Sequence, residues 1–282
     1  MSFRSSKRRS LPLMVLGVIS LLVVAVLNLG WSASAGPATR APARHHQPKP
    51  TIVLVHGAFA DASGWNKVSA RLQKAGYTTY APPNNLRGPL TDSEYLRSFL
   101  STIDGPIVLV GHSYGGALIT NASTGNPHVK ALVYVAAYAL DEGESVLEAS
   151  ALGGGSSDLA ANLVVRPYPG APPGDGDAWI DPAAFRRLFA QDLPRRLTSV
   201  MASAQRPAAL SGLATPSGVP GWKTIPSYYL VASQDRTIPP AAERAMAKRA
   251  KARTVEIRSS HVAMMSHPKA TTKLIIRAAR GR

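Results

Sequence analysis

Short, mostly apolar runs alternate with longer amphipathic stretches from residue 51 onward. Apolar runs of this length are typical of strands that are buried on both faces, and the stretches between them have the period of helices. Six runs predict strands, at residues 51–55, 78–81, 107–110, 131–137, 228–232 and 254–257. The alternation predicts an α/β fold in which a mostly parallel six-stranded sheet is flanked by helices and joined by right-handed crossovers.

The stretches between the strands predict five helices around the sheet, at residues 63–75, 91–102, 114–123, 240–251 and 268–279. In the second of these, Thr91 is expected as the N-cap, and Glu94 three residues later completes a capping box. The last helix begins at Pro268, which suits the first turn of a helix.

Residues 141–222 interrupt the alternation of strands and helices. They contain a Pro/Gly-rich stretch at 167–176, with helical pieces on its C-terminal side. Because the interruption follows one core strand and precedes the next, we expect it to form a small helical lid over an active site. The core domain is then built from residues 51–140 and 223–282.

The N-terminal region has the order of an export signal. A basic stretch ends at Arg9, an apolar run spans residues 11–31, and Ala33-Ser34-Ala35 follows. This order predicts a signal peptide over residues 1–35, cleaved after Ala35, and an uncleaved anchor over residues 11–31 is the alternative. Both interpretations place the domain outside the cytoplasm and leave the export route open. Residues 36–50, rich in Pro, Ala, Arg and His, are expected to form a flexible linker.

The formal net charge of +16 is concentrated at the two ends of the chain. Residues 1–50 carry seven bases and no acid, residues 236–282 carry twelve bases and two acids, and the part between is nearly balanced. No nucleic-acid-binding motif accompanies the basic C-terminal region, so we expect a solvated helix face there and no nucleic-acid partner. The chain has no cysteine, which excludes thiolate nucleophiles and cysteine-ligated metals.

One glycine-flanked serine lies between a predicted strand and a predicted helix. The segment reads Gly-His-Ser-Tyr-Gly at residues 111–115, with Ser113 at its centre. A Gly-x-Ser-x-Gly segment in this context is the signature of a nucleophile elbow, where a sharp turn presents the serine at the carboxyl end of the sheet. Ser113 is therefore the predicted nucleophile.

A serine nucleophile needs a base, and the base needs an orienting carboxylate. In this fold the acid and then the base follow the serine along the chain, on loops after later strands. His261 follows the last predicted strand and is the expected base, whereas His267 is expected to cap or pack the final helix. Asp235 follows the preceding strand and is the expected acid, with Asp141 as its rival.

The oxyanion of an acyl-transfer intermediate needs backbone N–H donors. We expect one from Tyr114, directly after the nucleophile, and one from Ala58 in the loop after the first strand, with Phe59 as the alternative. His56 in the same loop is expected to brace it through its ring nitrogens. Apolar side chains, among them Phe59, Trp65 and Trp222, are expected to contact substrate.

Three segments together carry a family resemblance. HGAFADASGW at residues 56–65, GHSYGG at 111–116 and SHVAM at 260–264 resemble the bacterial α/β-hydrolases related to plant methyl esterases and hydroxynitrile lyases. The resemblance covers roughly residues 51–280. It implies the α/β-hydrolase fold and a lid over residues 141–222.

The resemblance also implies a catalytic triad of Ser113, Asp235 and His261, in agreement with the chain order. The implied activity is a carboxylesterase that hydrolyses small-molecule esters through an acyl-enzyme. No metal or organic cofactor is implied. A membrane contact is expected only through an uncleaved N-terminal segment, and the oligomeric state is open.

Two other functions remain on the same scaffold. The first is a hydroxynitrile lyase, in which a lysine near the site assists the cyanide leaving group, and Lys223 lies near the end of the predicted lid. The second is a non-catalytic ligand-binding protein. All three triad positions are filled, which argues against the second.

Overall fold

The computed structural model describes residues 48–282. The predicted signal peptide or anchor, at residues 1–35, and the predicted linker up to residue 47 lie outside the described residues. Within residues 48–282, no helix combines the length and the apolar character needed to cross a membrane.

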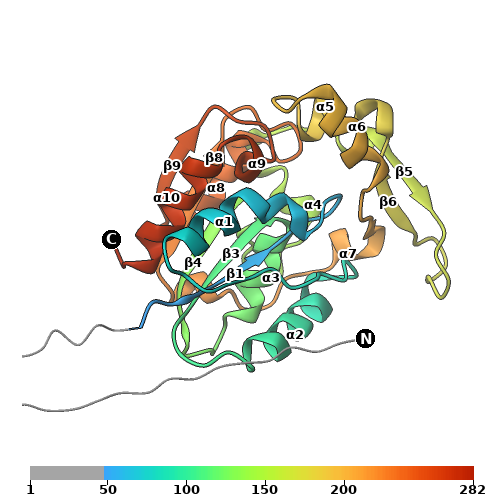
Figure 1. The fold of residues 1–282 in the computed structure, drawn as a ribbon. Helices are drawn as coiled ribbons and strands as arrows, with labels where there is room; N and C mark the ends of the chain where they lie inside the picture. Colours follow the sequence, from blue (N-terminus) through green and yellow to red (C-terminus); the bar gives the residue numbers. More distant parts are fainter. Residues whose placement is uncertain (1–47) are drawn as a thin grey trace, which may run out of the picture. The chain divides into compact units, whose positions relative to one another are not determined.

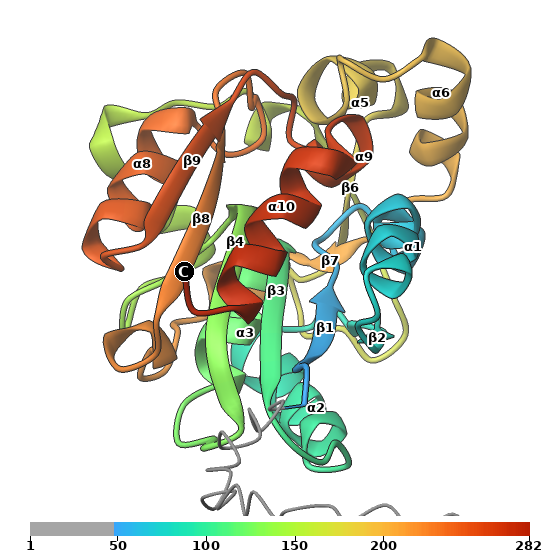
Figure 2. The ribbon, with the colours of Figure 1, turned by 60° about the vertical axis from the view of Figure 1, so that its left-hand side comes forward.

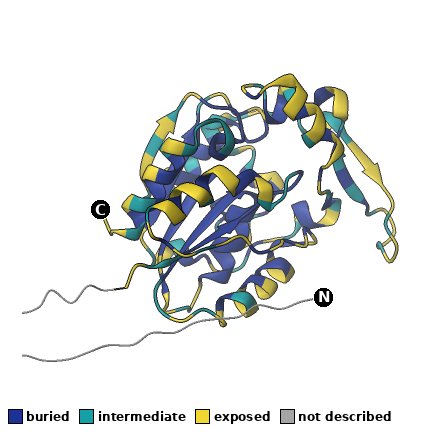
Figure 3. Cartoon of the chain, in the orientation of Figure 1, coloured by how far each residue is buried: buried dark blue, intermediate teal, exposed yellow. Residues whose placement is uncertain are grey.

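The core is a six-stranded, wholly parallel sheet in the order β2-β1-β3-β4-β8-β9. Its strands match the six that the sequence predicts, and they are β1 (Thr51–Val55), β2 (Thr79–Tyr80), β3 (Ile107–Ser113), β4 (Val129–Ala137), β8 (Ser227–Ala232) and β9 (Arg253–Ile257). Strands β3 and β4 lie in the middle of the sheet and are buried almost throughout, as Figure 3 shows. Burial on both faces explains why these strands are continuous apolar runs.

Helices cover both faces of the sheet (Figure 2). Right-handed crossovers that run in the same direction along a sheet place their helices on the same face. Three helices accordingly lie on one face, namely α2 (Pro89–Leu100), α3 (Tyr114–Ala122) and α8 (Pro240–Arg249). The crossover from β1 to β2 runs the opposite way, so α1 (Asn66–Lys74) lies on the other face, beside α10 (Pro268–Ala279). Two short helical elements pack beside α1, namely η1 (Ala62–Trp65) and α9 (Ala263–Ser266).

The second predicted helix begins earlier than its sequence suggests. Helix α2 starts at Pro89, after Gly88, and Thr91 is not its N-cap. The carboxylate of Asp92 accepts hydrogen bonds from the backbone N–H groups of Arg87 and Gly88, at 3.0 and 3.2 Å. A side chain inside the first turn therefore binds the N–H groups before it, and the expected capping box does not form.

Between β4 and β8, residues 141–222 form the insertion that the sequence predicts as a small helical lid (Figure 1). It contains helical segments, which are α4 (Val146–Ala149), η2 (Leu152–Gly154), η3 (Ala160–Asn162), α5 (Pro182–Phe189), α6 (Arg195–Ser203), α7 (Leu210–Ala214) and η4 (Gly221–Lys223, which extends one residue beyond it). It also contains a three-stranded antiparallel sheet that was not predicted, made of β5 (Leu163–Arg166), β6 (Asp177–Ile180) and β7 (Ala208–Ala209). These strands leave no clear hydrophobic pattern in the sequence, because β5 and β6 have four residues each, β7 has two, and β5 is largely exposed.

Candidate active site

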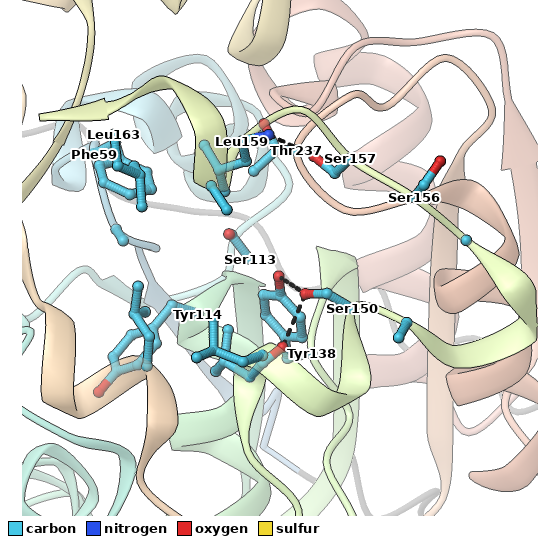
Figure 4. Close-up of a pocket in the computed structure, with 17 residues that line it drawn as sticks. Phe59, Ser113, Tyr114, Tyr138, Ser150, Ser156, Ser157, Leu159, Leu163 and Thr237 are labelled. Carbon is cyan, nitrogen blue, oxygen red and sulfur yellow. Dashed lines mark hydrogen bonds between the residues drawn. The ribbon is translucent and has the colours of Figure 1, made fainter.

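Ser113 is the last residue of β3 and immediately precedes α3. Its backbone has φ 52° and ψ −126°, a conformation that a residue with a side chain adopts only under strain. The sharp turn places the hydroxyl at the carboxyl end of the sheet, where it points into a cavity (Figure 4). This is the geometry of a nucleophile elbow.

The glycines on either side of Ser113 are required by close backbone contacts. A Cβ atom at Gly111 would lie 2.6 Å from the carbonyl oxygen of Gly115, and a Cβ atom at Gly115 would lie 2.5 Å from that of Val55. At Gly116 a Cβ atom would lie 2.6 Å from the carbonyl oxygen of Tyr138. Any side chain at these positions would push α3 away from the strands.

Asp235 and His261 form a buried acid–base pair on the loops after β8 and β9. His261 Nδ1 lies 2.5 Å from Asp235 Oδ2. The other carboxylate oxygen, Oδ1, accepts hydrogen bonds from the backbone N–H groups of Thr237 and Ile238, at 2.7 and 3.0 Å. The second ring nitrogen of His261, Nε2, has no hydrogen-bond partner within residues 48–282. The carboxylate is thus fixed from both sides, and one imidazole nitrogen is available to accept a proton.

His112, the residue before the serine, supports the loop that carries His261. Its Nε2 lies 3.0 Å from the backbone carbonyl oxygen of His261, and the two ring centroids are 4.6 Å apart. Burial lowers the pKa of His112 well below its usual value, and the adjacent His261 lowers it further. His112 is therefore neutral and donates its Nε2–H to that carbonyl.

The loop after β1 approaches the serine closely. A Cβ atom at Gly57 would lie 2.5 Å from the Cβ atom of Ser113, so only glycine allows this approach. In the described structure the N–H of Ala58 makes no hydrogen bond, whereas the N–H of Phe59 donates to the carbonyl of Arg206 at 2.8 Å. The N–H of Phe59 is therefore already engaged, whereas that of Ala58 is free to bind an oxyanion. The N–H of Tyr114, in the first turn of α3, has no acceptor within the helix.

His56 braces this loop as the sequence suggested. Its Nδ1 lies 2.9 Å from the carbonyl oxygen of Gly57, and its Nε2 accepts the N–H of Asn84 at 3.2 Å. Burial lowers the pKa of His56, so the ring is neutral and can donate at one nitrogen while it accepts at the other.

The cavity beside Ser113 has a volume of about 330 Å³. Its wall is mainly apolar and includes Phe59, Leu147, Leu159 and Leu163, as Figure 4 illustrates in part. Hydroxyl groups from the insertion and from Thr237 supply polar positions, and none of the described residues that line the cavity is charged. A cavity of this kind suits a small, uncharged, largely apolar molecule.

Two of the three residues expected to contact substrate do not line this cavity. Phe59 does, but Trp65 is fully buried in the core, where its ring lies edge-on to His112 with the centroids 6.5 Å apart. Trp222 donates its indole N–H to the carbonyl of Leu140 at 2.8 Å, and the adjacent Gly221 packs against Ser123 at the C-terminal end of α3. Both tryptophans have structural contacts instead.

The other candidates from the sequence lie outside the acid–base pair. Asp141, the rival acid, is partly exposed and forms an ion pair with Lys223 at 3.0 Å. His267 directly precedes α10, and its Nδ1 lies 2.9 Å from the hydroxyl of Ser266. Within residues 48–282, neither side chain forms a hydrogen bond or an ion pair with His261. Within residues 48–282 there is also no group of three or more His, Asp or Glu side chains that could hold a metal ion.

Comparison with known proteins identifies the family of this chain. Residues 52–274 match the sequence pattern of the Alpha/beta hydrolase family. Methylesterase 17 of Arabidopsis thaliana is 27% identical over 256 residues, which cover 82% of this chain and 91% of that protein.

Two solved structures share the fold. The crystal structure of polyneuridine aldehyde esterase superposes with a TM-score of 0.69 at 22% identity and covers 81% of this chain and 98% of its own. A pyrethroid hydrolase from Sphingobium faniae gives a TM-score of 0.67 at 23% identity, covering 82% and 97%. The chain belongs to the α/β-hydrolase family.

Proposed function

We propose that the protein is a serine carboxylesterase that hydrolyses small-molecule esters through an acyl-enzyme intermediate. The observation that carries the proposal is the buried Asp235–His261 pair, which has a free imidazole nitrogen and lies against His112, the residue before a serine on a strained elbow. The names of the relatives, two esterases and one hydrolase, support the same reaction class.

In the proposed reaction, Nε2 of His261 takes the hydroxyl proton of Ser113 as Oγ attacks the ester carbonyl carbon. The N–H groups of Ala58 and Tyr114 stabilise the oxyanion that forms. The C–O bond to the alcohol then breaks, and the alcohol leaves with the proton from His261. A water molecule, deprotonated by His261, attacks the acyl carbon and releases the acid and free Ser113. Asp235 stabilises the imidazolium in both steps.

The cavity defines the class of ester. Because its lining residues are mainly apolar and none is charged, a charged group on the substrate would lose hydration without gaining a partner. Its volume of about 330 Å³ accommodates a small aryl or alkyl group. The proposed substrates are therefore small, neutral esters.

The lyase alternative requires a lysine at the site. Lys223 pairs with Asp141 at 3.0 Å and does not line the cavity. No other lysine of the described residues lines it either. Measurement of cyanide release from cyanohydrins, alongside ester cleavage, distinguishes the two activities.

The proposed cellular location is outside the cytoplasm. The support is the N-terminal sequence, in which a basic stretch, an apolar run over residues 11–31 and Ala33-Ser34-Ala35 occur in the order of a signal peptide. An anchor retained over residues 11–31 would give the same location.

The proposed activity is tested with a panel of esters of graded acyl and alcohol size, using the wild type and Ser113→Ala. We expect kcat to fall about a thousandfold or more in the variant, the loss typical when a triad member is removed. Ser203→Ala is the matched control, because Ser203 is exposed at the end of α6 and does not line the cavity. Substantial activity in Ser113→Ala would overturn the mechanism.

A further inference from the structure

One short stretch of the insertion contacts both loops that carry the acid–base pair. Gln191 donates from Nε2 to the carbonyl of Gln234 at 2.5 Å. Asp192 accepts the backbone N–H of Ser260 at 2.9 Å and the hydroxyl of the same serine at 2.5 Å. Gln234 directly precedes Asp235, and Ser260 directly precedes His261. Two consecutive residues of the insertion thus bind the residue before the acid and the residue before the base.

Neighbouring contacts join the same parts of the structure. Thr237, whose N–H donates to Asp235, also donates its hydroxyl to the carbonyl of Leu188 at 3.0 Å. The ring of Phe189 packs against the imidazole of His261 with the centroids 4.9 Å apart. Residues 188–192 therefore bind the acid loop and the base loop and also cover the imidazole.

The stretch is itself held in place from within the insertion. The guanidinium of Arg186 donates to the carbonyls of Gln191 and Leu193, at 2.8 and 3.4 Å. Leu193 is buried, as is Ala190 on the other side of the turn. The position of Asp192 is therefore set by the fold of the insertion, and its carboxylate can serve as a fixed acceptor.

We propose that Asp192, assisted by Gln191, is a positioning residue that sets the geometry of the Asp235–His261 pair from the insertion. This inference rests on the proposed hydrolytic mechanism. Its physical basis is that Ser260 is fully buried, so loss of the Asp192 carboxylate leaves the Ser260 N–H without a partner and frees the base loop to shift. A displacement of about 1 Å at a reacting group can cost on the order of a hundredfold in rate.

The test compares Asp192→Ala with Asp192→Asn and with a control, Asp141→Ala. In Asp192→Ala we expect kcat to fall roughly tenfold to a hundredfold with little change in KM, because geometry at the reacting atoms changes while the cavity does not. Asp192→Asn keeps one acceptor oxygen for Ser260 and should recover part of the rate. Asp141 is partly exposed and forms an ion pair with Lys223 at 3.0 Å, away from residues 188–192, so its loss should leave kcat unchanged.

A second variant keeps the inference testable if Asp192→Ala fails to fold. Ser260→Ala keeps the backbone N–H bond to Asp192 and removes the hydroxyl, which donates to Asp192 and accepts the N–H of Val262 at 3.4 Å, so we expect a smaller loss of kcat. The downfield proton resonance of the His261 Nδ1–H reports the bond to Asp235 directly, and we expect it to broaden or move in both variants. Adding Ser260→Ala to Asp192→Ala should cause little further loss, since the two groups act through one contact.

The rate at which a fluorophosphonate labels Ser113 separates the two proposals. If the wild type is not labelled at Ser113, the hydrolytic mechanism itself fails. If the wild type is labelled and Asp192→Ala is labelled equally fast, with kcat and the resonance unchanged, only the positioning role is refuted. A rise in KM at constant kcat would also refute it, because that result would assign Asp192 to substrate binding.

Discussion

Two carboxyl groups are buried near the carboxyl end of β8, and their surroundings differ. Asp235 is bound by two backbone N–H groups and by the ring of His261. Glu243 accepts one N–H, from Ala232 at 3.0 Å, and its Oε1 has no partner within residues 48–282. Burial raises the pKa of Glu243 well above its usual value, and the nearby charge of Asp235 raises it further. We infer that Glu243 is a neutral acid at neutral pH.

This inference predicts how stability depends on pH. Below the usual glutamate pKa, Glu243 is protonated in both the folded and the unfolded chain. Above the usual glutamate pKa, the carboxyl group of Glu243 ionises in the unfolded chain but stays protonated in the folded chain. Folding stability therefore falls as pH rises toward the raised pKa of the folded state. Glu243→Gln cannot ionise, and its unfolding temperature relative to the wild type should therefore rise between pH 5 and pH 8, as measured by thermal unfolding.

Glu256→Gln provides a control of opposite sign. Its hydrogen bond to Arg244 lowers the pKa of Glu256, so its contribution to stability is present above the usual glutamate pKa and is lost as pH falls. This variant should be less stable than the wild type by a constant amount between pH 5 and pH 8, and the deficit should shrink only below that range. If the difference between Glu243→Gln and the wild type did not change with pH, Glu243 would not carry the assigned proton.

At the level of elements, the strand–turn–helix unit around Ser113 depends on the space that its glycines leave. We predict that Gly115→Ala destabilises the protein by about 1–3 kcal/mol, the usual cost of overpacking, because its Cβ would lie 2.5 Å from the carbonyl oxygen of Val55. Chemical denaturation measures the loss. Gly64→Ala is the matched control, since its Cβ would meet the flexible end of Met264 at 3.3 Å. Equal effects of the two substitutions would show that close packing at the elbow is unimportant.

The elements that could be predicted from sequence are those whose own residues determine them. The six core strands follow from buried apolar runs, and α10 begins at Pro268 as expected. The antiparallel sheet of the insertion was missed because β7 has two residues and β5 is largely exposed. The start of α2 was misplaced because its N-terminal bonds come from Asp92, whose position depends on a tertiary contact with the hydroxyl of Tyr114.

At the level of the whole molecule, the candidate site also has features that follow from the sequence and features that depend on contacts between distant residues. The chain order of an α/β-hydrolase predicts Ser113, Asp235 and His261, which lie at or just after the carboxyl ends of core strands, and the structure brings Asp235 and His261 together. The contact of Asp192 with Ser260 joins residues 68 apart in the chain and has no local sequence signal. The same limit explains Trp65 and Trp222, whose apolar character does not reveal whether a side chain lines a cavity or packs in the core.

The proposed location predicts the form of the mature chain. Cleavage after Ala35 should leave Gly36 as the first residue of protein recovered outside the cytoplasm, and N-terminal sequencing identifies it. Retention of the apolar run over residues 11–31 would instead keep the full-length chain in the membrane fraction. Full-length chain in the cytoplasm alone would contradict both forms of the proposal.

The proposed activity depends on Ser113 acting as a covalent nucleophile. The most direct measurement is peptide mass spectrometry of the folded protein after reaction with a fluorophosphonate, or with an ester whose acyl group is released slowly. We expect a single adduct on the peptide that contains Ser113, and no adduct in Asp235→Ala or His261→Ala on the same time scale, because neither variant can activate the serine. An unmodified Ser113 in wild-type protein, or an adduct on another residue, would contradict the central claim.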